Sequence, residues 1–166
     1  MSTHPFASLP SPARTNAPID RFRDEYRFLS NFWTVPAGVH YAWLTASTVE
    51  HVFQACKTTD EHDRSVILAA STAGQAKRLG KKVTLRPDWE ARKLGVMANL
   101  QASKYQDPDL RDRLLGTGDA ELIEGNHWCD TFWGVCHCDE HNGEGQNWLG
   151  RLLMVQRSVL VATVSL

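Results

Sequence analysis

The sequence predicts a single α+β domain in which several helices accompany a few short strands. Its 166 residues are 42% hydrophobic and 22% charged, which is typical of a globular chain that buries one core without disulfides. Capped segments with apolar residues at three- and four-residue steps recur along the chain and indicate helices. Short strand-like patterns lie near the beginning and near residue 121. No internal repeat or second domain is visible.

We expect the N-terminal 18 residues to form a flexible tail and residues 19–166 to form the single domain. The tail is rich in Ser, Pro, Ala and Thr and has no apolar periodicity. From residue 19 to residue 43 the pattern is short and strand-like. We expect a strand over 26–33, a turn at 36–38 and a second strand over 39–44 that pairs back.

A helix over residues 47–57 is the most informative local prediction. Ser47 is placed to cap it, and Glu50 stands three residues later, as in a capping box. The apolar stripe of this helix consists of Val49, Val52, Phe53 and Cys56. Glu50, Gln54 and Lys57 share an adjacent face at i, i+4 and i+7. That face is interpreted either as an exposed polar row beside a cap or as the wall of a polar pocket.

The rest of the chain predicts mainly helices. Asp107 and Pro108 suit the cap and first position of a helix that Gly116 closes. The expected helices cover residues 63–70, 73–79, 86–106, 107–116 and 148–161, with a strand over 121–124.

The composition also excludes some classes of protein. No apolar run approaches the length of a membrane span, and the N-terminus lacks the pattern of a secretory signal, so we expect a cytoplasmic protein without a membrane partner.

Four cysteines without framework spacing predict free thiols. The residue types of Cys129, Cys136, His137, Cys138 and His141 suit zinc, but their spacing lacks the usual gap within a ligand pair, so no metal site is predicted.

Carboxylates and aromatic rings in polar surroundings suggest hydrolysis of a bond to a sugar. Hydrolysis at an anomeric carbon passes through an oxocarbenium-like state, which carboxylates such as Glu50 and Asp130 stabilise. A planar leaving group could stack on Trp89 or Trp133. A basic cluster over residues 77–93 and a glycine-rich loop over 143–147 suit a phosphate, although a solvated helix face is the alternative for the cluster.

A pocket that recognises a nucleotide without reacting is a second hypothesis for the same residues. Asn31, in an aromatic setting, then reads the polar edge of a ligand or holds a neighbouring turn.

Several of these stretches together resemble one family. The stretches are residues 28–32, 48–57, 86–90, 130–134 and 145–154. In that order they resemble the NADAR family, also called YbiA-like, over about residues 22–157. The resemblance implies a mainly helical α+β fold and an N-glycosidase activity that needs no metal and no organic cofactor.

The resemblance also implies roles for particular residues. Glu50, Asp130 and Trp89 match the catalytic motif positions of the family. The other matching pocket positions are Asn31, Gln54, Lys57, Trp133, Gly134 and Asn147. Which carboxylate acts as acid and which as base stays open.

Two substrate classes are known in the family. Some relatives cleave phosphorylated intermediates of riboflavin biosynthesis, and others remove ADP-ribose from guanine in nucleic acid, often as antitoxin to an ADP-ribosyltransferase toxin. Cys136, His137 and Cys138 follow Gly134 where riboflavin-type relatives have a shorter glycine-rich segment. This departure favours ADP-ribosylated DNA as the substrate and a cognate toxin as the partner.

Overall fold

The computed structural model describes residues 17–164, so most of the predicted tail, residues 1–16, lies outside the described residues. The elements in chain order are the 3₁₀ helix η1 (Asp24–Leu29), β1 (Val39–Tyr41), β2 (Leu44–Ala46), α1 (Val49–Ala55), α2 (Glu61–Leu68), α3 (Ala73–Gly80), α4 (Trp89–Lys104), α5 (Pro108–Gly116), β3 (Gly125–Asn126), β4 (Val135–Cys136) and α6 (Trp148–Val164). The mainly helical α+β fold with little sheet is therefore confirmed.

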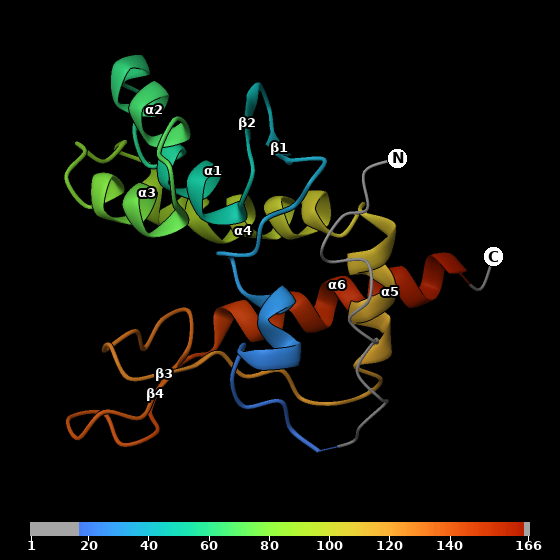
Figure 1. Cartoon of the computed structure of the whole chain (residues 1–166). Helices are drawn as coiled ribbons and strands as arrows, with labels where there is room; N and C mark the ends of the chain where they lie inside the picture. Colours follow the sequence, from blue (N-terminus) through green and yellow to red (C-terminus); the bar gives the residue numbers. More distant parts are fainter. Residues whose placement is uncertain (1–16, 165–166) are drawn as a thin grey trace.

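The helices form two groups that face each other (Figure 1). One group contains α1 to α4 and the β1–β2 hairpin, and the other contains α6, α5 and η1. Helix α4 joins the groups because it packs against α1, β1 and α6. The core between them includes Phe28, Val52, Leu100 and Leu153, all with 0% exposure. Within residues 17–164, no helix is long and apolar enough to cross a lipid bilayer.

Three strand predictions differ from the structure. Residues 24–29 form a 3₁₀ helix because the adjacent side chains of Phe28 and Leu29 both enter the core, which an alternating strand does not allow. The predicted strand over 39–44 is instead divided between the two strands of a hairpin, β1 and β2. In this hairpin Val39 pairs antiparallel with Ala46. The strand predicted over 121–124 is reduced to an isolated bridge between Leu122 and Ile19.

Helix α1 lies at the centre of the fold, because all seven of its residues are buried. The predicted cap at Ser47 is wrong by one residue: the Thr48 hydroxyl accepts the backbone N–H of His51 at 3.3 Å. The predicted apolar stripe is confirmed. At α5, the expected Asp107 cap is confirmed, since its carboxylate accepts the N–H of Leu110 at 3.1 Å.

Candidate active site

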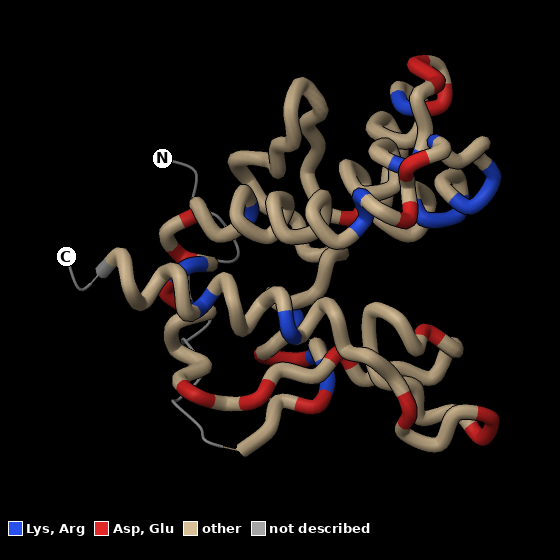
Figure 2. Tube along the Cα trace, turned by 180° about the vertical axis from the view of Figure 1, so that it is seen from behind, with Lys and Arg blue, Asp and Glu red and all other residues tan. Residues whose placement is uncertain are grey.

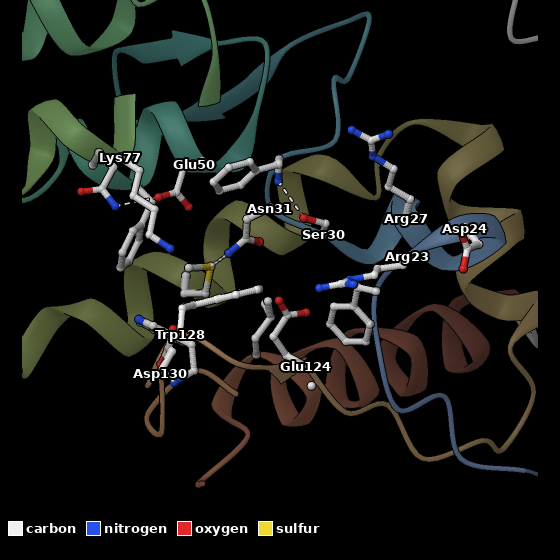
Figure 3. Close-up of a pocket in the computed structure, with 18 of the residues that line it drawn as sticks. Arg23, Asp24, Arg27, Ser30, Asn31, Glu50, Lys77, Glu124, Trp128 and Asp130 are labelled. Carbon is white, nitrogen blue, oxygen red and sulfur yellow. Dashed lines mark hydrogen bonds between the residues drawn. The ribbon is translucent and has the colours of Figure 1, made fainter. Parts of the chain in front are cut away.

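A cavity of about 550 Å³ lies between the two helix groups. Helices η1, α1, α3, α4 and α6 contribute to it, together with residues 124–133 (Figure 3). Its charged lining residues are Arg23, Asp24, Arg27, Glu50, Lys57, Lys77, Glu124 and Asp130. The volume lies in the ordinary range for small-molecule sites, and the charges suit a polar, phosphorylated ligand.

One side of the cavity, here called the helical wall, consists of Glu50, Gln54 and Lys57. Gln54 Nε2 donates a hydrogen bond to Glu50 Oε1 at 2.7 Å, and both side chains are buried. Burial raises the pKa of Glu50, while the charges of Lys77 and Lys57 act in the opposite direction. The interpretation of this face as an exposed polar row is therefore wrong, and the pocket-wall interpretation is confirmed.

Close packing keeps Gln54 beside Glu50. A Cβ on Gly80 of α3 would collide with the Gln54 side-chain oxygen, so α3 approaches α1 closely at this point. Burial lowers the pKa of Lys57, and Glu50 counteracts this effect. The helical wall thus combines a desolvated carboxyl with a nearby ammonium.

The opposite side, here called the loop wall, consists of residues 124–134 and carries Glu124 and Asp130. Burial and the negative charge of Asp130 raise the pKa of Glu124 to about 7. Among the described residues, Glu124 Oε2 has no hydrogen-bond partner. A carboxyl with a pKa near neutrality is suited to general acid catalysis.

Asp130 is held by the backbone of its own loop. Its Oδ1 accepts the backbone N–H groups of Trp133 at 2.8 Å and Phe132 at 3.2 Å. The buried Asn126 donates from Nδ2 to the Asp130 carbonyl at 2.8 Å. These contacts fix the orientation of the Asp130 side chain and of its main chain in the loop wall.

Basic side chains reach the cavity from two sides. Figure 3 shows Lys77 near Glu50 at one end and Arg23 and Arg27 at the other. Of the basic cluster predicted over 77–93, Lys77 is the residue that lines the cavity. Other members form surface ion pairs, such as Arg92 with Asp88, and Figure 2 marks the positions of basic residues along α3 and the following turn in blue. Most of the cluster is therefore a solvated surface.

Aromatic side chains form the mouth of the cavity. Lys77 Nζ lies 5.8 Å from the centre of the Phe32 ring and 5.9 Å from that of Trp128. These rings are 42% and 53% exposed, so a ligand can reach them. Trp133 also lines the cavity, and its ring meets Phe53 edge-on with centroids 5.4 Å apart.

Asn31 lines the cavity between the walls. Its Oδ1 accepts Nε2 of the buried Gln101 at 2.7 Å, and its Nδ2 lies 3.6 Å from the Met97 sulfur. Its backbone carbonyl accepts the N–H of Glu50 at 3.0 Å. The Asn31 side chain is thus fixed by another side chain, and its main chain supports the helical wall.

Comparison with known proteins identifies the family. The family model described as the NADAR domain matches residues 19–161. The chain belongs to the NADAR family.

The relatives of this NADAR protein carry informative names. N-glycosidase YbiA of Escherichia coli is 39% identical over 140 residues, which cover 82% of this chain and 83% of that protein. A riboflavin biosynthesis protein of Vibrio vulnificus is 36% identical over 82% of this chain, which spans only 36% of that longer protein. The NMR structure of E. coli YbiA superposes with a TM-score of 0.75 at 32% identity, covering 93% of this chain and 90% of that one.

Six of the nine NADAR motif residues selected from the sequence line the cavity, namely Asn31, Glu50, Gln54, Lys57, Asp130 and Trp133. Trp89, Gly134 and Asn147 are not among the residues that line it. Trp89 is 5% exposed and packs behind Phe53, with ring centroids 5.1 Å apart. In this structure it therefore has no direct access to a ligand in the cavity.

Gly134 and Asn147 both contact the main chain of Glu124 in the loop wall. Asn147 Oδ1 accepts the N–H of Glu124 at 3.0 Å, and its Nδ2 donates to the Leu122 carbonyl at 2.8 Å. A Cβ on Gly134 would collide with the Glu124 carbonyl oxygen. Both residues thus position Glu124, which the sequence analysis missed because it was assigned to the end of a strand. A single carboxylate two residues after the buried Leu122 gave no apolar periodicity of its own.

Cavity carboxylates do not gather into a metal site. Among residues 17–164, the one group of His, Cys, Asp or Glu side chains that could hold a metal ion lies outside the cavity and contains three cysteines and His141.

Proposed function

We propose that the substrate of this NADAR N-glycosidase is a ribosyl group that carries phosphate and is joined through an N-glycosidic bond to a planar base. The juxtaposition of Glu50, Glu124 and Asp130 with Lys57 and Lys77 in one cavity carries this proposal. Carboxylates stabilise the oxocarbenium-like transition state, and cationic side chains bind phosphate. The names of the relatives support the N-glycosidase class.

In the proposed reaction, water attacks the anomeric carbon and the bond from this carbon to the base nitrogen breaks. The bonding electrons leave with the base, and Glu124 donates a proton to the base nitrogen. Asp130 or Glu50 stabilises the positive charge on the sugar and accepts a proton from the water. A pKa of about 7 suits Glu124 to the donor role.

Within this class we propose ADP-ribosylated guanine in DNA as the substrate. The exposed rings of Phe32 and Trp128 at the mouth, with Lys77 between them, support a substrate that extends out of the cavity. Stacking of a base on an aromatic ring contributes about 1–3 kcal/mol, and lysine adds attraction for the backbone phosphates. A toxin that attaches ADP-ribose to guanine is then the partner in function.

A phosphorylated intermediate of riboflavin biosynthesis is the second candidate. It is supported by the names of the Vibrio vulnificus relative and of a Zea mays relative, both of which are called riboflavin biosynthesis proteins. Such a substrate carries no attached polynucleotide and needs no contact with the exposed rings.

The test uses the full chain with two substrates in parallel: an oligonucleotide that carries ADP-ribosyl guanine, and the early phosphorylated riboflavin intermediates. Mass spectrometry follows free ADP-ribose in the first reaction and ribose phosphate in the second. Release of ADP-ribose supports the proposal, and cleavage of the riboflavin intermediates alone replaces it with the second candidate. Tight binding without cleavage of either substrate would favour the binding module. Glu121→Gln, an exposed carboxylate three residues before Glu124, is the matched control.

A further inference from the structure

Three cysteines and a histidine converge beside the loop wall. Cys129, Cys136, Cys138 and His141 each offer one ligand atom, and these atoms all lie within 4.8 Å of one another. None of these residues lines the cavity. The fourth cysteine of the chain, Cys56, is buried at the end of α1.

The distances in this cluster are those of a ligand set. Cys138 Sγ lies 3.7 Å from Cys129 Sγ, 3.3 Å from Cys136 Sγ and 3.2 Å from His141 Nδ1. Two sulfurs bound to one tetrahedral zinc at about 2.3 Å are about 3.8 Å apart. A disulfide requires about 2.05 Å, so these sulfurs are not bonded to each other.

The backbone is folded so that the four side chains point inward. Cys129 has a positive φ of 62°, which is uncommon for a residue with a side chain and turns the loop back toward β4. Cys136 lies in β4 with 0% exposure. The N–H of Asn142 donates to the Cys138 carbonyl at 2.8 Å and closes the turn that carries His141.

Hydrophobic burial does not explain this turn. Between His137 and Gln146 the sequence contains no aliphatic and no aromatic hydrocarbon side chain. A segment of this composition has no apolar surface to bury, and small loop-rich segments of this kind obtain their stability from a metal or from disulfides.

We propose that Cys129, Cys136, Cys138 and His141 bind a structural Zn²⁺ ion. Four protein ligands leave no open position for water, which is the arrangement of structural rather than catalytic zinc. The ion ties β4 and the following turn to the loop wall, because Cys129 lies directly between Trp128 and Asp130. This site is independent of the proposed N-glycosidase function, since it contributes rigidity and not a reacting group.

The residue types of this site suit zinc in the sequence, but their spacing along the chain argued against a metal site. The ligands Cys136 and Cys138 are separated by one residue, and Cys129 lies seven positions before Cys136. The folded loop brings Cys129 to the other three ligands.

The test measures zinc in the full chain, purified without chelator and without a polyhistidine tag. Elemental analysis should find one zinc per chain, and the Co²⁺-substituted protein should show the thiolate-to-metal absorption of a tetrahedral site. Cys138→Ser and His141→Ala should lose most of the zinc, whereas Cys56→Ala, the matched control, should retain it. Removal of zinc by a strong chelator should lower the thermal midpoint, and added Zn²⁺ should restore it.

Two results would overturn the proposal. One is a wild-type chain that remains without zinc after incubation with stoichiometric Zn²⁺ under reducing conditions. The other is a zinc content that Cys138→Ser leaves unchanged, because that would indicate adventitious binding elsewhere. Each measurement reads metal content, so its outcome does not depend on whether the glycosidase substrate has been identified correctly.

Discussion

The helical wall orients Glu50 through a contact within one helix, whereas the loop wall positions Glu124 through a contact with a distant segment of the chain. In the helical wall, Gln54 reaches Glu50 one helical turn away. In the loop wall, Glu124 depends on Asn147, which is 23 residues later in the chain. One cavity therefore combines a locally determined side with a side that forms only when the whole chain folds.

The two walls meet at Phe53. This ring from α1 contacts Trp89 of α4 on one side and Trp133 of the loop wall on the other. Tertiary contacts of this kind couple the position of the loop to that of the helix. The following predictions separate the two walls, beginning with the largest expected effect.

Replacing Glu50 by glutamine should remove the chemical contribution of the helical wall and leave its structure intact. Glutamine can still accept the hydrogen bond from Gln54, and it removes a carboxyl whose ionisation is opposed by burial. We expect turnover to fall by roughly 100- to 10,000-fold, the usual contribution of a positioned acid or base. Single-turnover kinetics and thermal unfolding measure the two effects. Near-normal turnover would leave Glu50 with a structural role alone.

Replacing Trp89 by alanine should mainly weaken the packing where the walls meet. The ring is 5% exposed, and truncation of a buried tryptophan typically costs about 3–5 kcal/mol of the free energy of unfolding. Trp89→Phe should recover part of this loss. Denaturant unfolding and affinity for ADP-ribose are measured on the same samples. A large loss of affinity with little loss of stability would instead restore the stacking role expected from the sequence.

The loop wall should give the enzyme a pH dependence near neutrality. If Glu124 is the proton donor, its pKa of about 7 means that activity falls above this pH, by about tenfold per pH unit. Rate profiles of the wild type and of Glu121→Gln should share this limb. A profile that stays flat from pH 6 to pH 9 would exclude Glu124 as the donor.

The raised pKa of Glu124 should also make the free energy of unfolding depend on pH. The usual pKa of a glutamate is 4.5 and that of folded Glu124 is about 7, so the folded state holds the proton more tightly than the unfolded state. The free energy of unfolding therefore decreases as pH rises from about 4.5 to about 7. Glu124→Gln should flatten this part of the curve, which denaturant titrations at several pH values can measure.

The smallest predicted effect concerns the cap of α1. Thr48→Ala should cost about 1 kcal/mol, because the first turn loses its side-chain acceptor for the N–H of His51. Ser47→Ala is the matched control and should change stability by less than about 0.5 kcal/mol, because this exposed side chain is not the cap. Equal losses in both variants would show that the cap is shared.

Features that depend on neighbouring residues could be predicted from the sequence alone. The Asp107 cap and Pro108 located α5, and the apolar stripe of α1 placed Glu50, Gln54 and Lys57 on one face. These features follow from hydrogen bonds and side-chain spacing within one or two helical turns. The linked family motifs added the fold and the N-glycosidase class, which the comparisons with known proteins confirm.

The tertiary structure determines which residues meet across long stretches of sequence. It brought Glu124 into the cavity, placed Trp89 behind Phe53 and gathered Cys129 with Cys136, Cys138 and His141. Loop residues have no periodicity that predicts the direction of a side chain. Their positions depend on contacts such as Gln101 with Asn31, which are 70 residues apart and exist only after the core has formed.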